Sequence, residues 1–125
     1  MERIVLIASW AGVLLGFLIG GAVGLHIYDS QWLGGYASWP RRMLRLGHVS
    51  MVALPMLNFA SVFSVAHFHL EGSGPKGLLG LLLFGQVSMP LVCFLSAYKP
   101  RFRHLFPVPV ASLTAAAVGF LYLSL

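Results

Sequence analysis

Residues 4–27 read IVLIASWAGVLLGFLIGGAVGLHI, and this stretch decides the class of fold. It contains no Asp, Glu, Lys or Arg. A helix needs about 20 mostly apolar residues to cross the hydrocarbon of a bilayer, so residues 4–27 predict a transmembrane helix. The alternative is a cleaved signal peptide. The apolar part is too long for one, Glu2 offsets the charge of Arg3, and no clear cleavage site follows.

Three further stretches outside this segment have the same character, at residues 46–70, 77–98 and 105–125. The whole chain is 58% hydrophobic and 9% charged, against about 25% charged residues in a soluble domain. Polar or basic residues and turn signals, such as Gly72–Pro75 and Lys99-Pro100, separate the stretches. We therefore predict an all-α integral membrane protein. Residues 1–125 form a single domain, an antiparallel up-and-down bundle of four transmembrane helices.

The distribution of Lys and Arg predicts the orientation of this bundle. With four spans, Arg3 and Lys76 fall on the side of the two termini. The opposite side carries the other six cations, which are Arg41, Arg42, Arg45, Lys99, Arg101 and Arg103. Because Lys and Arg are enriched in cytoplasmic loops, we expect the first and third loops in the cytoplasm and both termini on the non-cytoplasmic side of a cell inner or plasma membrane. The basic residues lie in loops between spans, which argues against nucleic acid as a partner despite the net charge of +5.

Small residues in the first segment predict close helix packing. Gly12, Gly16, Gly20 and Gly24 follow Ala8 at intervals of four residues and form a ridge along one helix face. Small residues let two helices approach closely in lipid. The ridge is expected to pack against the fourth segment of the same chain, through Ala111, Ala115 and Gly119, or against another membrane subunit.

Few polar side chains lie inside the predicted spans, and two of them are amides. Asn58 shares a helix face with Met51 and Pro55, and Gln86 shares one with Pro90. An amide without a partner is costly in hydrocarbon, so we expect Asn58 and Gln86 to face the bundle interior and to bond to each other or to nearby backbone. Contact with a solute or cofactor is the alternative.

The histidines suggest two cofactor sites. His48 and His26 lie near the predicted cytoplasmic interface, and Arg45 precedes His48 closely. Two imidazoles from different helices can bind the iron of haem b, and an arginine can meet its propionates. An interfacial histidine without any metal is the simpler interpretation.

A second group of possible ligands, formed by His67, His69 and Glu71, lies near the opposite interface. Imidazole and carboxylate ligands suit zinc or copper. A solvated helix end explains the same residues. Met89 and Cys93 could bind copper(I), although both are also ordinary packing residues.

The sequence favours a non-catalytic protein. No acidic or basic residue lies in the middle of a span, and no known catalytic motif is present. Two functions stay open. The first is an accessory subunit or assembly partner of a larger membrane complex, such as a respiratory complex, which contacts its partners through the glycine ridge or the basic loops. The alternative is a protein that binds haem b or a metal and transfers electrons or metal ions.

Overall fold

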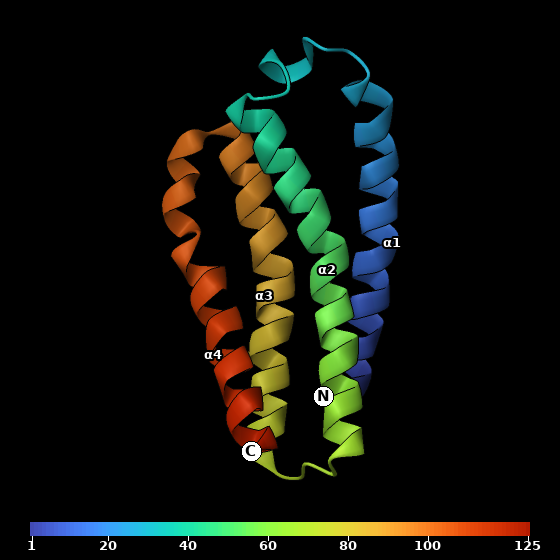
Figure 1. Ribbon diagram of the computed structural model, residues 1–125, viewed down its shortest axis with the longest axis vertical. Coiled ribbons are helices and arrows are strands. Elements are labelled where there is room, and N and C mark those ends of the chain that lie inside the picture. The colour runs from blue at the N-terminus through green and yellow to red at the C-terminus, as the bar shows by residue number, and fades with distance from the viewer.

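The computed structural model describes all 125 residues, and every regular element in it is helical. Four long helices run alternately up and down (Figure 1). They are α1 (Glu2–Ile27), α2 (Trp39–His67), α3 (Ser73–Tyr98) and α4 (Pro107–Ser124), with two short 3₁₀ helices, η1 (Trp32–Gly34) and η2 (Pro100–Leu105). Helices α1, α2 and α3, and η2 together with α4, are long and apolar enough to cross a membrane.

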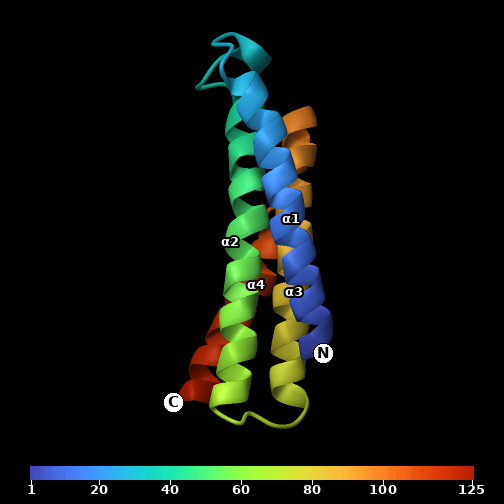
Figure 2. The ribbon, with the colours of Figure 1, turned by 90° about the vertical axis from the view of Figure 1, so that its right-hand side faces the viewer.

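The antiparallel α2–α3 hairpin forms the centre of the bundle. Helix α1 packs mainly on α2, and α4 packs mainly on α3. The two views place α1 and α4 on opposite sides of the hairpin (Figures 1 and 2). Both termini lie at the end of the bundle that holds the α2–α3 loop, which we call the terminal end. The opposite end, with the α1–α2 and α3–α4 connections, holds most of the Lys and Arg residues and is called the basic end.

The boundaries of the second helix differ most from the prediction. It begins at Trp39 instead of residue 46, so Arg41, Arg42 and Arg45 lie on its first turns and not in a loop. Pro40 in the first turn explains the early start, because its fixed φ suits a helix start and its missing N–H is not needed there. The helix ends at His67 instead of residue 70, and His69 adopts the left-handed conformation with φ 50°.

The remaining boundaries lie closer to the prediction. Helix α1 ends at Ile27 and α3 at Tyr98, as expected, whereas α3 begins at Ser73 instead of residue 77. Residues 100–105 form η2, so the fourth long helix begins only at Pro107. Pro100, the first residue of η2, separates this turn from α3, because the residue before a proline is pushed out of the helical conformation.

The glycine ridge of α1 packs against α2. A Cβ at Gly12 would lie 2.9 Å from Pro55 Cγ, and one at Gly16 would lie 2.8 Å from Val52 Cγ2. A Cβ at Gly20 would overlap the His48 ring, whereas Gly24 has open space around it. Three of the four ridge glycines therefore allow α1 to approach α2. The helix that they meet is the second, and not the fourth that the sequence suggested.

Candidate functional site

A buried polar network joins α1, α2 and α3. The amide nitrogen of Asn58 on α2 donates to Gln86 Oε1 on α3, and Ser9 Oγ on α1 donates to the same oxygen at 3.3 Å. Gln86 Nε2 donates to the carbonyl of Ala8 at 2.8 Å. All three side chains are almost completely buried. The structure thus brings Asn58 and Gln86 together and adds α1 through Ser9, which the sequence analysis did not single out.

The network is largely, but not fully, satisfied. Ser9 Oγ lies closer to the carbonyl of Val5, at 2.7 Å, so the single proton of this hydroxyl is shared between that carbonyl and Gln86 Oε1. Asn58 Oδ1 is buried without a hydrogen-bond partner. The chemistry of the three groups is that of neutral donors and acceptors, so the network can fix the register of three helices but offers no acid, base or nucleophile of ordinary strength.

A mid-bundle cavity of about 310 Å³ lies beside the network. Gln86 and Pro90 of α3, Met51 of α2 and Gly12 of α1 contribute to its lining. Pro55 and Pro90 have no N–H for the carbonyls four residues earlier, those of Met51 and Gln86. The wall of the cavity is mostly apolar, with the Gln86 side chain as its polar group.

The haem prediction placed His26 and His48 around one group. His26 is exposed, its Nδ1 lies 2.8 Å from the carbonyl of Ala22, and its ring stacks on Trp32 with centroids 5.3 Å apart. His48 packs against Gly20 and lines a lateral cavity with Phe17, and its buried Nδ1 has no partner. That cavity does not include His26. The two histidines therefore have separate surroundings, and haem binding stays a prediction.

The arginines of the basic end have two different environments. Arg41 is 3% exposed; its guanidinium donates to the carbonyl of Ile27 at 2.6 Å and to those of Asp29 and Ser30, both at 3.3 Å. These carbonyls end α1 and begin the following loop, where the helix dipole favours a cation. Arg45 lies over the Tyr36 ring, 4.1 Å from its centroid, and donates to the Tyr36 carbonyl at 3.2 Å. Both arginines therefore attach the α1–α2 loop to α2.

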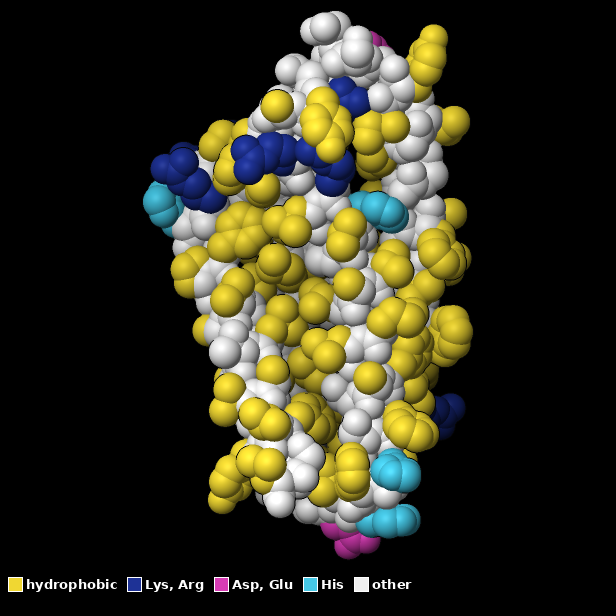
Figure 3. Space-filling view, viewed as in Figure 1, with side chains coloured by type: hydrophobic (Ala, Val, Ile, Leu, Met, Phe, Trp, Pro, Cys, Tyr) yellow, Lys and Arg dark blue, Asp and Glu magenta, His cyan; other side chains and the backbone are white.

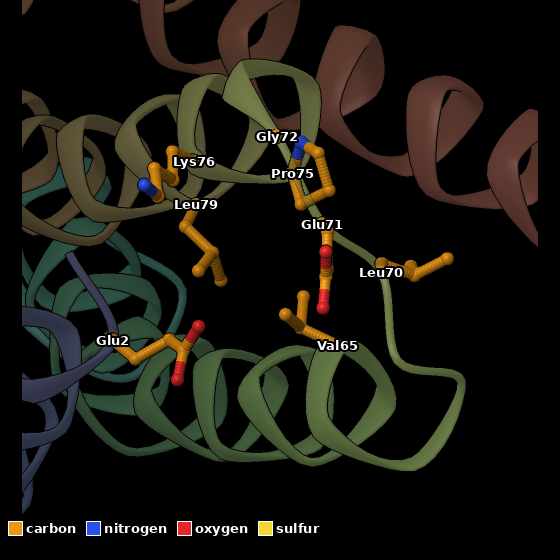
Figure 4. A pocket seen from close by; sticks show the side chains of 8 residues that line it. All are labelled: Glu2, Val65, Leu70, Glu71, Gly72, Pro75, Lys76 and Leu79. Atoms are coloured by element: carbon orange, nitrogen blue, oxygen red, sulfur yellow. The ribbon is translucent and has the colours of Figure 1, made fainter.

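At the terminal end, the predicted metal ligands do not form a cluster. His67 stacks on Phe63 with centroids 5.6 Å apart, and no group of three His, Cys, Asp or Glu side chains could hold a metal ion. Glu71 instead lines a pocket of about 330 Å³ with Glu2 and Lys76 (Figure 4). Neither His67 nor His69 lines this pocket. Cys93 is a buried free thiol in α3.

The surface is divided by charge. Lys and Arg side chains gather in a belt across the basic end, over η2 and the start of α2, above a broad hydrophobic surface (Figure 3). This division follows from the positions of six cations, which are Arg41, Arg42 and Arg45 on the first turns of α2 and Lys99, Arg101 and Arg103 between α3 and α4.

Comparisons with known proteins give no family or relative from which a function could be inferred. No family model matches the chain, and neither a curated protein nor a solved structure is significantly similar to it.

Proposed function

We propose that the chain is a multi-pass membrane protein that serves as a non-catalytic accessory subunit or assembly partner of a larger membrane complex. The observation that supports this most is that the buried polar side chains in the middle of the bundle form hydrogen bonds within the protein. Ser9, Asn58 and Gln86 bond to one another and to backbone across three helices. They stabilise the bundle and leave no ionisable group in its middle for proton transfer or ion coupling.

The outer helices supply the contact surface in this proposal. Helices α1 and α4 bury a smaller share of their residues than α2 and α3 do. Gly12, Gly16 and Gly20 already face α2, so a partner helix can use only the remaining end of the ridge at Gly24, or the basic connections. A small residue with open space around it permits close approach of another helix.

Orientation belongs to the same proposal, with the basic end in the cytoplasm. Single cysteines test it in a Cys93→Ser background, with Ser30→Cys at the basic end and Gly74→Cys at the terminal end. We expect a membrane-impermeant maleimide to label only Gly74→Cys in intact cells, and both variants after permeabilisation. Labelling of only Ser30→Cys in intact cells would invert the orientation.

Co-purification tests the accessory role. The tagged protein is extracted from its native membrane in a mild detergent and passed over two columns of different chemistry. We expect another membrane protein to stay with it at a constant molar ratio, and the ratio to fall in Gly24→Leu or in Arg42→Gln. Elution of the protein alone, folded and without a constant partner, would contradict the proposal.

The visible spectrum of the same sample tests the haem alternative, which His48 alone favours through its unpartnered buried nitrogen. A Soret band in near-stoichiometric amount that disappears in His48→Ala would replace the accessory proposal with electron transfer. We expect a spectrum without a Soret band, in both the oxidised and the dithionite-reduced sample.

A further inference from the structure

An apolar groove opens at the basic end, between the start of α2 and the end of α3. It has a volume of about 320 Å³ and is lined by Leu33, Pro40, Leu44, Phe94, Ala97 and Tyr98. Gly47 lets the two helices meet below it, because a Cβ there would lie only 2.6 Å from Phe94 Cε1. Leu33 reaches the groove from η1 in the left-handed conformation, with φ 54°. The lining is hydrocarbon and aromatic carbon, with the Tyr98 hydroxyl as its one polar side-chain group.

A cation lies beside this groove, and two more follow it along the chain. The Lys99 amine is 5.5 Å from the ring centroid of Tyr98, which is itself a lining residue. Lys99 is exposed and is followed by the exposed Arg101 and Arg103 in η2, which packs on α3. Lys and Arg side chains form a belt across this end of the molecule in Figure 3.

The cations of the basic end outnumber its acidic residues. Of the three acidic residues in the chain, Glu2 and Glu71 line the pocket at the terminal end. Asp29 is the remaining one, and its carboxylate, which accepts the backbone N–H of Gln31 at 2.9 Å, is a single negative charge against six cations at the basic end. An anion from outside the chain therefore complements this end.

We propose that the groove binds an anionic phospholipid. One acyl chain lies along Leu44, Phe94 and Ala97, and the phosphate-bearing headgroup meets Lys99 and Arg101. An apolar slot beside an excess of cations matches a ligand that carries a hydrocarbon chain and a negative charge, and the inner leaflet of a cell membrane supplies such lipids. The inference rests on the membrane location proposed above, but not on the accessory role.

Native mass spectrometry of the detergent-purified protein measures this binding. The protein is titrated with phosphatidylglycerol and with phosphatidylcholine of identical chains, and retained lipid is counted. We expect the anionic lipid to be preferred by an order of magnitude or more, since each surface cation contributes about a five-fold gain in affinity for an anionic surface. Equal retention of the two lipids would overturn the proposal.

Matched charge variants locate the site. Lys99→Gln with Arg101→Gln removes the lysine next to the lining residue Tyr98 and the next arginine along the chain, in η2, and Arg3→Gln with Lys76→Gln removes the same charges at the terminal end. We expect the first pair to abolish the preference and the second to leave it unchanged. An equal effect of both pairs would show attraction to net charge and would refute a site at the groove.

A substitution in the lining of the groove tests the contact with the acyl chain of the lipid without changing the contact with its headgroup. Ala97→Phe fills the groove and keeps every cation, so we expect several-fold weaker retention of phosphatidylglycerol. Unchanged retention would refute binding in the groove. Inorganic phosphate at constant ionic strength serves as the last control, because displacement of the lipid by phosphate alone would identify a site for a free anion instead.

Discussion

The two outer helices, α1 and α4, both pack on the central hairpin through glycines, and they do so differently. Between α1 and α2, Gly12, Gly16 and Gly20 all lie on α1 and receive side chains of α2. Between α3 and α4, Gly85 of α3 receives Leu113, whereas Gly119 of α4 receives Leu78 of α3. The first interface also adjoins the network of Ser9, Asn58 and Gln86, which has several hydrogen bonds between helices. The second has one, from Ser112 Oγ to the carbonyl of Leu81 at 2.7 Å.

The difference teaches how apolar helices acquire a defined partner. Close approach stabilises both interfaces through van der Waals contact, which any pair of helices with small residues can achieve. Hydrogen bonds depend on register, because a donor and an acceptor must meet at one level of both helices. We therefore expect substitutions to be more costly at the α1–α2–α3 contact than at the α3–α4 contact. Unfolding free energies from SDS titration in mixed micelles, followed by circular dichroism, test this.

Gly12→Leu is expected to have the largest effect, a loss of about 3 kcal/mol, because overpacking forces helices apart. Even the first added carbon would lie 2.9 Å from the rigid ring of Pro55 and 2.8 Å from Gln86 Nε2. Gly24→Leu adds the same atoms where no neighbour lies within 4 Å, and should leave the unfolding free energy unchanged. Equal losses in the two variants would mean that the close contacts at Gly12 do not decide the result.

Gln86→Leu should destabilise the bundle by about 2 kcal/mol, since three hydrogen bonds at roughly 0.6 kcal/mol each are removed. It also leaves the buried Asn58 amide nitrogen without its acceptor. Adding Asn58→Leu should therefore cost less than the sum of the two single variants. Strict additivity in this double-mutant cycle would show that the two amides do not act together.

Arg41→Lys should cost about 1.5 kcal/mol, because a lysine cannot reproduce the planar fork that donates to several carbonyls. Arg41 acts where the ridge no longer contacts α2, so its loss should loosen the end of α1 in particular. Hydrogen exchange near Ile27 is the local measurement. Arg42→Lys, at an exposed position of the same helix turn, is the control and should match the wild type.

Ser112→Ala should have the smallest effect, about 0.6 kcal/mol for one hydrogen bond between helices. Ser124→Ala provides the comparison, because the Ser124 hydroxyl bonds only within its own helix at the exposed end of α4. If Ser112→Ala cost as much as Gln86→Leu, the proposed contrast between the two interfaces would be wrong.

The sequence predicted part of the candidate site. The glycine spacing pointed to a packing face on the first helix, and the two amides pointed to a contact between the second and third. Ser9 was missed, although it is the only hydroxyl in residues 4–27 and lies three positions before Gly12. Arg41 was treated as a loop charge because the early start of α2 was not predicted. Its partners are backbone carbonyls, which every residue has, so no pattern of side chains could have identified them.

The amino-acid sequence by itself determined four long apolar segments, their alternating directions and the concentration of cations at one end. These are properties of local composition, since a helix satisfies its own backbone hydrogen bonds within one segment. Only the tertiary structure decided that α1 meets α2, that Gln86 bonds to both neighbours, and that a groove opens beside Lys99. Several pairings of similar apolar faces have nearly the same burial, so the choice among them depends on the contacts of particular side chains between segments distant in sequence.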